Sequence, residues 1–466
     1  MRASSLRKKY FGDRAFYKMA LAVAVPIMIQ NGITQFVGLL DNVMVGRVGT
    51  EQMTGVAIAN QLIFVFNLAI FGAVSGAGIF GAQFYGQGNQ DGVRYAFRFK
   101  LLLSLVLTGL GMGLFLLWDE PLIMLYLQGE AASPESITLS LGYAKEYLSI
   151  LLISFVPFTL SQCYASTLRE TGETVVPMVA GVISVLVNLG LNTVLIFGYL
   201  GFDAMGSAGA AIATVVARFV EAAVVILWTH LHTKKFPYAK GLLRSLRIPA
   251  SLVGGMFKKT LPLLLNEMFW ALGMALLSQC YSLHGYDVVS AYNITSTVTN
   301  VFNVAFMALA TAIGIIVGQQ LGANKFEEAV DTDRKLIVFS TLITIGIGAI
   351  MAAVSGAIPQ IYNTTGEIRS LASSLLLVAA LCMPINALAS ACYFTMRSGG
   401  KTLITFLFDS VYICCLTVPI AYLLSSVTSI HIIPLFLICQ LADLGKCVIG
   451  LILIQKGLWI QNIVKE

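Results

Sequence analysis

The chain has 466 residues, of which 57% are hydrophobic and 11% are charged, and its formal net charge is +6. Soluble domains contain about 25% charged residues, so this composition excludes an ordinary water-soluble enzyme and indicates a chain whose solvent is mostly lipid. Stretches without any charged residue recur along the whole length. Most of them approach the ~20 residues that a membrane-spanning helix requires.

We therefore predict an all-α membrane protein with twelve transmembrane helices. The first apolar segment is too long for a signal peptide and lacks a small-residue cleavage site, so we expect a retained span. The eight cysteines lie in apolar segments, which favours free, buried thiols, and the four histidines show no metal-ligand spacing within a span. In chain order the predicted helices cover residues 16–45, 53–84, 94–118, 138–167, 175–199, 205–231, 260–282, 288–320, 335–358, 369–396, 402–424 and 431–455.

Lysine and arginine are distributed asymmetrically between alternate loops. With the N-terminus inside, most of the 29 basic residues fall in inside segments, whereas the outside loop "WDEPLIMLYLQGEAASPES" is purely acidic. The positive-inside rule then places both termini in the cytoplasm. The basic segment 233–259 has two interpretations, a site for anionic lipid or nucleic acid and a topology-setting cytoplasmic linker. We favour the linker and expect no nucleic-acid partner.

A short charged loop occurs twice. "STLRETGET" (166–174) and "FTMRSGGKT" (394–402) share Thr-x-Arg-x-x-Gly-x-Thr, and "GIFGAQFYG" (78–86) matches "GIIVGQQLG" (314–322). Six helices per half make these parallel repeats, an architecture of transporters whose two bundles surround a central site. We expect an N-terminal lobe over 1–232, the linker 233–259 and a C-terminal lobe over 260–466. In the loops we expect Gly172 and Gly400 to permit tight turns, and Arg169 and Arg397 to cap carbonyl ends and anchor at the inner interface.

Placing a polar or ionisable side chain inside the membrane costs free energy, so such residues are functional candidates by default. In the N-terminal lobe these candidates are Asp41, late in the first helix, and Asn188 and Asn192, one turn apart on the fifth. Together they would form a polar pocket for a proton or Na⁺. The alternatives are an interfacial carboxylate near Arg47 and amides that only join helices.

In the C-terminal lobe, Glu267 and Asp409 lie at similar depth, roughly 12 Å from the inner ends of their helices. A shared cation or substrate site is one interpretation, and local partners such as Asn266 or Ser410 are the other. Trp270 is our one aromatic candidate for lining a substrate cavity, together with the carboxylates of Asp41, Glu267 and Asp409.

Two further charged pairs, one near the end of each half, have i,i+3 spacing. They are Arg218 with Glu221 and, with reversed charges, Asp443 with Lys446. Because such neighbours neutralise each other on one helix face, we interpret them as structural ion pairs.

These features together resemble the multidrug and toxic-compound extrusion (MATE) family. The resemblance rests on the twelve spans in two halves, the Gln-x-x-Gly ends of the second and eighth helices, the repeated loops, "LLDNVMVGRVG" (39–49) and "GSAGAAIAT" (206–214). It covers nearly the whole chain. The sequence departs from the family pattern at Asn192, where one branch has Asp, and at Asn386, where another branch has an acidic residue.

The resemblance implies a membrane antiporter that exports amphipathic, often cationic drugs in exchange for H⁺ or Na⁺, and not an enzyme. It implies Asp41 as the coupling carboxylate of the N-terminal lobe and Glu267 as an acidic residue of the C-terminal one. We expect no cofactor beyond the coupling ion, a monomer in the bacterial inner membrane, and a small-molecule substrate. The alternative is a flippase for lipid-linked oligosaccharide precursors, which would need several cavity arginines.

Overall fold

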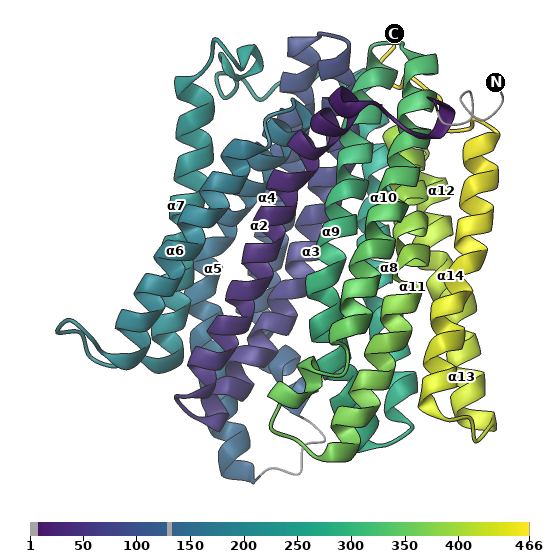
Figure 1. The fold of residues 1–466 in the computed structure, drawn as a ribbon. Helices are drawn as coiled ribbons and strands as arrows, with labels where there is room; N and C mark the ends of the chain where they lie inside the picture. Colours follow the sequence, from purple (N-terminus) through teal and green to yellow (C-terminus); the bar gives the residue numbers. More distant parts are fainter. Residues whose placement is uncertain (1–7, 128–132, 466) are drawn as a thin grey trace. The chain divides into compact units, whose positions relative to one another are not determined.

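The computed structural model describes residues 8–127 and 133–465, and these residues contain helices and no strand (Figure 1). The predicted outer acidic loop runs through residues 128–132, so that part of it lies outside the described residues. Twelve helical segments of the described chain are long and apolar enough to cross a membrane. The prediction of an all-α protein with twelve spans is therefore confirmed.

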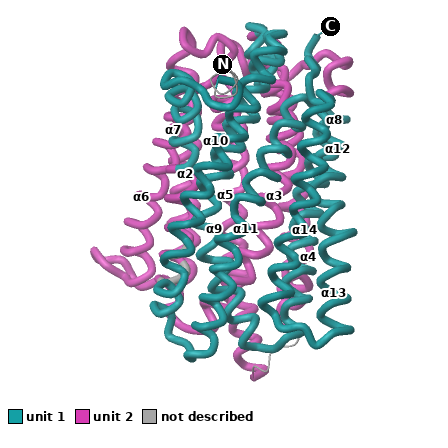
Figure 2. Tube along the Cα trace, turned by 45° about the vertical axis from the view of Figure 1, so that its right-hand side comes forward, with its two compact units in different colours: residues 1–28, 82–89, 257–466 teal, residues 29–81, 90–256 magenta. Residues whose placement is uncertain are grey.

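The chain divides into two compact units, which Figure 2 distinguishes by colour. Unit 2 comprises Ile29–Gly81 and Gln90–Met256, and unit 1 comprises Met1–Met28, Ala82–Asn89 and Phe257–Glu466. Three helices are shared between them. The helix α2 (Arg14–Gly46) changes unit after Met28, α3 (Thr50–Gly86) after Gly81, and α8 (Ala250–Ser282) after Met256.

Within unit 2, small residues allow close helix packing. The helix α7 (Gly206–Leu231) packs against α5 (Pro134–Glu170) and α6 (Val175–Phe197). Buried alanines and glycines line α7, and a Cβ atom at Gly209 would lie 2.8 Å from the Leu195 backbone. Small residues let membrane helices approach in this way, which explains the segment "GSAGAAIAT". The remaining helix of unit 2 is α4 (Gln90–Leu127), which packs on α5.

Unit 1 is built around α11 (Gly366–Ser398), which packs against α9 (Tyr286–Gly322), α10 (Phe326–Val354) and α14 (Ile432–Gln455). The helix α8 (Ala250–Ser282) begins at residue 250 rather than at 260 as predicted. Residues 250–260 contain no proline, so the helix that begins after Pro249 continues into the predicted span. The span predicted at 402–424 is a continuous helical segment made of α12 (Thr402–Phe406), π-helical turns over 407–417 and α13 (Val418–Val427).

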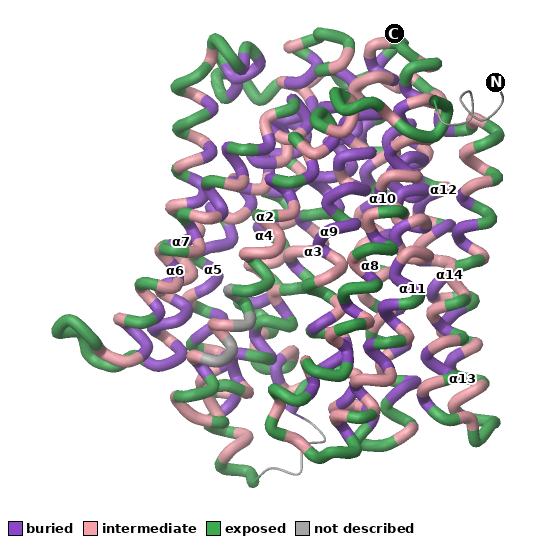
Figure 3. The backbone as a smooth tube through the Cα atoms, in the orientation of Figure 1, coloured by how far each residue is buried: buried purple, intermediate pink, exposed green. Residues whose placement is uncertain are grey.

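The repeat is visible in how deeply the helices are buried (Figure 3). In α3, α5, α9 and α11, 61–67% of the residues in an apolar 18-residue window are buried, whereas in the other spans the share is 22–39%. These four are the second and fourth helices of each half. The two halves therefore use the same helices as their inner elements, as a duplicated ancestor would.

All eight cysteines are free, so the prediction of free thiols is confirmed. Six of them are buried, but Cys414 is half-buried and Cys415 is exposed. The prediction that all eight are buried is therefore wrong at these two positions, because an apolar span exposes one face to lipid.

The basic linker is folded against unit 2. The guanidinium of Arg98, which is only 7% exposed, donates hydrogen bonds to the carbonyl oxygens of Leu242, Arg247 and Gly241 at 3.0–3.2 Å. Arg94 donates to the carbonyl of Tyr238 at 3.0 Å. Two arginines of α4 thus hold the linker backbone, while its lysines 234, 235 and 240 remain exposed.

The Gln-x-x-Gly motifs mark a crossing of two helix ends within unit 1. A Cβ atom at Gly86 would overlap the carbonyl oxygen of Gln319, and one at Gly322 would overlap the carbonyl oxygen of Gln83. The fully buried Gln83 side chain donates to the carbonyls of Ser398 (2.9 Å) and Gln461 (3.2 Å) and accepts from the amide of Ile463 (2.8 Å). The glycines therefore permit the crossing, and the glutamine fastens it to the C-terminal tail.

Gly322→Ala is expected to destabilise the folded protein by about 1–3 kcal/mol, because the added methyl group meets backbone that has no other rotamer to adopt. Thermal unfolding of the purified protein in detergent measures this. Gly346→Ala, on exposed α10 with no atom within 4 Å of the new Cβ, is the matched control and should be neutral or slightly stabilising. Equal melting temperatures for the two variants would contradict the close crossing.

Candidate cation-binding sites

The predicted polar residues of the N-terminal half lie together in unit 2. The amide nitrogen of Asn192 donates to a carboxylate oxygen of Asp41 at 2.6 Å and to the side-chain oxygen of Asn188 at 3.1 Å. Asn188 donates in turn to the hydroxyl of Thr214 at 3.2 Å. Asn192 is 1% exposed. The structure therefore brings Asp41, Asn188 and Asn192 into one hydrogen-bonded chain, and adds Thr214 of α7, which sequence reasoning missed.

The Asn192 amide has a free acceptor in this cluster. Both of its hydrogens are used, but its side-chain oxygen is buried and has no hydrogen-bond partner. Leaving a buried acceptor unpaired costs about 1–3 kcal/mol, so the site would be more stable with a donor or a cation against that oxygen. No lysine, arginine or histidine nitrogen lies within 4.0 Å of the Asp41 carboxylate in the described part of the chain. A carboxylate and an unpaired amide oxygen suit a proton or a hard cation.

The nearby charges of unit 2 neutralise one another. Arg218 and Glu221 form an ion pair at 2.9 Å, and the Arg218 guanidinium lies 5.1 Å from the ring centre of Phe158. Lys145, which the sequence placed in a span, pairs with Asp119 at 3.4 Å and Glu120 at 3.0 Å. The predicted Arg218–Glu221 pair is confirmed, which leaves Asp41 as the unpaired carboxylate of the predicted N-terminal site.

The predicted residues of the C-terminal half meet around Asn266 in unit 1. Asn266, 2% exposed, donates to Asp409 at 3.2 Å and to the hydroxyl of Tyr393 at 3.3 Å, and accepts from Ser410 at 2.7 Å. Glu267 is the next residue of α8. The expected local partners of Asp409 therefore include Asn266, and Asp409 itself lies in the π-helical turn 407–411. Such turns occur frequently at functional sites.

A buried lysine joins this cluster. Lys446 of α14, whose side chain is 5% exposed, lies 3.1 Å from Asp409 and 3.5 Å from Asp443. The predicted Asp443–Lys446 pair is confirmed, but its lysine also neutralises Asp409, which sequence reasoning missed. A charged residue in an apolar span needs a partner. Asp409 has no lysine or arginine within its own span, and that was the available signal. Glu267 has no such cation within 4.0 Å among the described residues.

Two other predicted positions lie on the edge of the cluster. Trp270, half-buried, lies three residues after Glu267 on α8, so the two share a helix face. Asn386 donates to Gln440 of α14 at 3.4 Å, and its own oxygen is buried without a partner. Asn386 thus contacts Gln440 rather than Asp409.

The repeated loops have the expected turns. Gly172 and Gly400 adopt positive φ angles of 84° and 71°, which only glycine reaches without strain. Arg169 donates to the side-chain oxygen of Gln30 at 3.2 Å, so its recorded partner is a side chain of α2 rather than a helix-end carbonyl. The Arg397 guanidinium lies 5.1 Å from the ring centre of Phe394. The loops thus fix arginines against neighbouring side chains.

Known proteins resemble this chain along both halves. A model of the MatE family matches residues 26–194 and 262–423. These segments begin at Pro26 and Pro262, which have the same separation in the sequence as the segments 78–86 and 314–322 of the repeat. The chain is 23% identical over 411 residues to the probable multidrug resistance protein NorM of Thermotoga maritima, covering 87% of this chain and 85% of that protein. It is 26% identical over 418 residues to the probable multidrug resistance protein YoeA of Bacillus subtilis, covering 88% and 87%.

Solved structures have the same fold. A mutant of the Vibrio cholerae MATE transporter VcmN superposes with a TM-score of 0.85 at 17% identity, covering 96% of this chain and 98% of that one. The family model matches well over half of the chain, in both repeats. The protein is therefore a multi-pass membrane protein of the MATE family, whose members are transporters and not enzymes.

Proposed function

We propose that this transporter exports amphipathic, often cationic compounds in exchange for H⁺ or Na⁺. The relatives named as probable multidrug resistance proteins support efflux of such compounds. The protein would act as a monomer in a bacterial inner membrane with both termini in the cytoplasm, as the basic inner loops favour. It would need no cofactor beyond the coupling ion.

The observation that carries the proposal is the cluster of Asp41, Asn192 and Asn188. Its single carboxylate lacks a protein cation within 4.0 Å in the described residues, and the adjacent Asn192 oxygen lacks a donor. A proton on Asp41, or Na⁺ between the carboxylate and that amide oxygen, would satisfy both groups. Because Asn192 stands where a second carboxylate would repel the first, one bound cation suffices to neutralise the site.

Coupling would arise from competition for the same negative charge. A cationic substrate and the coupling ion each stabilise the site, and each would favour a different packing of the helices around it. A ligand shifts such an equilibrium only by its differential affinity for the two states. Binding the ion from outside would therefore release the substrate outward, and losing the ion inside would prepare the site for the next substrate.

In the C-terminal half, Glu267 is the carboxylate available to a substrate or ion, because Lys446 holds Asp409. Trp270 on the same helix face would supply an aromatic surface for an amphipathic molecule. Asp409 would then order Asn266 beside Glu267, through the contact at 3.2 Å.

Glu267→Gln is expected to reduce export of a cationic dye by about 5–150-fold, which corresponds to a typical coupling free energy of ~1–3 kcal/mol. The change removes the charge and keeps the shape, so thermal unfolding should be close to wild type. Dye efflux from proteoliposomes measures the effect. Glu367→Gln, at an exposed position of α11, is the matched control. Wild-type efflux by the Glu267 variant would exclude this residue from the mechanism.

The competing hypothesis is a flippase for lipid-linked oligosaccharide precursors. Such a protein would need unpaired arginines for a pyrophosphate. The arginines within the spans of unit 2 are engaged instead: Arg94 and Arg98 with linker carbonyls, Arg169 with Gln30 and Arg218 with Glu221. This engagement favours export of cations over transfer of an anionic headgroup.

The decisive experiment reconstitutes the wild-type protein in liposomes that contain a fluorescent cationic dye. A pH gradient and a Na⁺ gradient are then applied separately, each with an ionophore control that dissipates it. Dye movement under one gradient alone identifies the coupling ion. Absence of movement under both would reject the antiporter, and lipid-linked oligosaccharide translocation would then be measured in the same vesicles.

A further inference from the structure

A buried aspartate of unit 1 has no part in the sites described above. Asp333 of α10 is 1% exposed, and no lysine, arginine or histidine nitrogen lies within 4.0 Å of its carboxylate in the described chain. Its recorded hydrogen-bond partner is the hydroxyl of Thr395, with 2.6 Å between the two oxygens. Thr395 is the first threonine of the repeated loop motif.

The N-terminal repeat shows the role of this threonine. The hydroxyl of Thr167, at the matching position, donates to the carbonyl of Cys163 four residues earlier, at 2.9 Å. It accepts a hydrogen bond from the ammonium group of Lys100 on α4, at 3.0 Å. A hydroxyl has one hydrogen and two acceptor sites. In this repeat, Lys100 on the third helix therefore donates and Thr167 accepts.

The C-terminal repeat places an acid where that donor stands. The hydroxyl of Thr395 lies 3.0 Å from the carbonyl of Ala391, again four residues earlier. The single hydrogen of Thr395 has two acceptors within reach, the Ala391 carbonyl and the Asp333 carboxyl. When it is directed to Ala391, as the hydrogen of Thr167 is directed to Cys163, the Asp333 contact requires a proton on the carboxyl, which then donates to the threonine oxygen. A neutral acid also avoids an unpaired charge at a position that is 1% exposed.

The two halves also differ in charge compensation. In the N-terminal half, Glu170 neutralises Lys100 at 2.8 Å. Ser398 occupies the position that matches Glu170 in the second loop, and it is neutral. The titratable groups that interact electrostatically with Asp333 are the Cys392 thiol of α11 and, on its own helix, Arg334, which lies beyond 4.0 Å of the carboxylate. Lys335 is occupied by Asp331, and α9 and α2 contribute apolar residues of the same core cluster.

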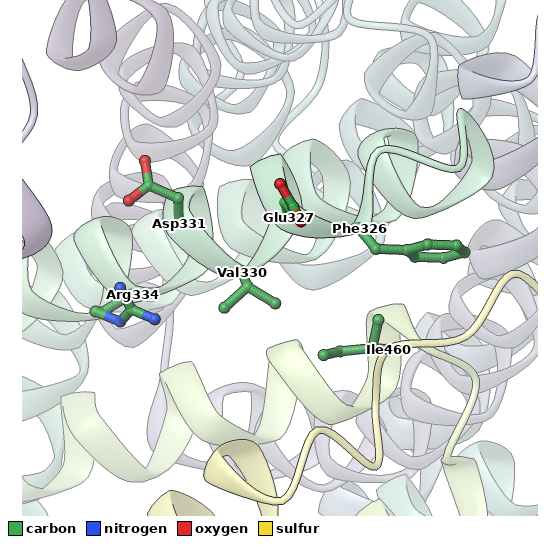
Figure 4. A pocket seen from close by; sticks show the side chains of 6 residues that line it. All are labelled: Phe326, Glu327, Val330, Asp331, Arg334 and Ile460. Carbon is green, nitrogen blue, oxygen red and sulfur yellow. The ribbon is translucent and has the colours of Figure 1, made fainter.

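An open pocket lies beside the start of α10 (Figure 4). It measures about 320 Å³ and is lined by Phe326, Glu327, Val330, Asp331, Arg334 and Ile460. Phe326, Val330 and Asp333 follow one face of the helix, because residues three and four apart share a face. Asp333 therefore lies one turn beyond residues that line this pocket, on the side that the basic loops place in the cytoplasm.

We propose that Asp333 is a second proton-binding site of this transporter, which holds a proton in the present conformation and releases it to the cytoplasm through the pocket beside Val330. The proton leaves the carboxylic acid for water, and the carboxylate takes it back when the site closes. Its occupancy acts on Thr395 and hence on the second repeated loop. The inference rests on the proposed cation exchange, with the proton as the ion.

The first test measures protonation directly, without transport. Infrared spectra of the purified protein should contain the carbonyl band of a neutral carboxylic acid that disappears in Asp333→Asn. The control Asp331→Asn, two residues away and paired with Lys335, should keep it. Thr395→Val should shift the same band, because it removes the hydroxyl that is hydrogen-bonded to the Asp333 carboxyl. This second variant also tests the assignment if Asp333→Asn fails to fold. A band unchanged in these variants would overturn the proposal.

The second test measures release. Asparagine imitates the protonated acid permanently, so Asp333→Asn should reduce proton-driven dye export by about tenfold or more, the scale of a lost proton-transfer group. Glu367→Gln, at an exposed position of α11 outside the pocket, should export normally. Export by Asp333→Asn with the wild-type rate and pH dependence would show that the proton never leaves. If the wild-type protein does not export the dye, the proposed function is rejected. The infrared spectra would still report whether Asp333 carries a proton, because they do not depend on transport.

Discussion

Asp41→Asn is expected to reduce gradient-driven export of a cationic dye by about 5–150-fold, which corresponds to a coupling free energy of ~1–3 kcal/mol. The asparagine side chain has the shape of the aspartate, and its oxygen still accepts the hydrogen bond that Asn192 donates at 2.6 Å. The variant therefore keeps the chain from Asp41 to Thr214 but loses the charge. Binding of ion and cationic substrate should weaken together, because both depend on that charge.

The measurement combines three readings on the same preparation. Thermal unfolding should be within ~0.5 kcal/mol of wild type, as expected for a change that breaks no packing contact. Dye export under a pH or Na⁺ gradient should fall, and equilibrium dye binding should weaken. Asp203→Asn, at an exposed position in the loop after α6, removes a charge from the same unit and should change none of them. Undiminished export by Asp41→Asn would exclude this residue as the coupling carboxylate.

A companion substitution separates charge from hydrogen bonding. Asn192→Ala keeps the Asp41 carboxylate but removes its donor and the unpaired amide oxygen. If that oxygen holds the coupling cation, the ion dependence of export should weaken while the dye still binds. A proton needs only the carboxylate, so a proton-coupled protein should retain its pH dependence in this variant.

Much of the architecture was predictable from the sequence because a membrane restricts the length and composition of the segments that cross it. A span needs a long apolar run, and a charge within it needs a reason. The absence of charge located the helices, and the repeated motifs located the two halves. The same reasoning selected Asp41, Asn188 and Asn192, which the structure joins by hydrogen bonds. Because Asn188 and Asn192 lie one turn apart on one helix face, the Asn192 amide can donate to Asn188 as well as to Asp41.

The remaining contacts depended on which helices become neighbours. Lys446 has a partner at Asp443 on its own helix, so nothing in the local pattern required a second one at Asp409, 37 residues away. Asp333 lies near a helix start beside Arg334 and Lys335, where charges usually face water. Its burial depends on the helix face directed at α11. The burial of Lys100 against Glu170 likewise depends on which helices are neighbours, so the sequence indicated only one more basic residue on the inner side.

Lys100→Met is expected to be the most destabilising single change in unit 2. The ammonium group is fully buried and donates to both oxygens of Glu170 at 2.8 and 2.9 Å, to Ser166 and to Thr167. Gly78 and Gly81 of α3 make room for this carboxylate, since a Cβ atom at either would overlap it. Removing one partner of a buried ion pair costs about 3–5 kcal/mol, because the other charge stays buried without it.

Thermal or denaturant unfolding in detergent measures this cost, and a double-mutant cycle assigns it. Glu170→Gln in the Lys100→Met background removes the isolated charge and should recover a large part of the lost stability. The control Lys145→Met breaks an ion pair with Glu120 whose lysine is 38% exposed, and such surface pairs contribute about 0–1 kcal/mol. A Lys100 variant as stable as the Lys145 variant would mean that Glu170 is solvated or protonated. Lys100 would then not be a charged donor to Thr167, and the two repeats would not contrast a basic donor at Thr167 with an acidic one at Thr395.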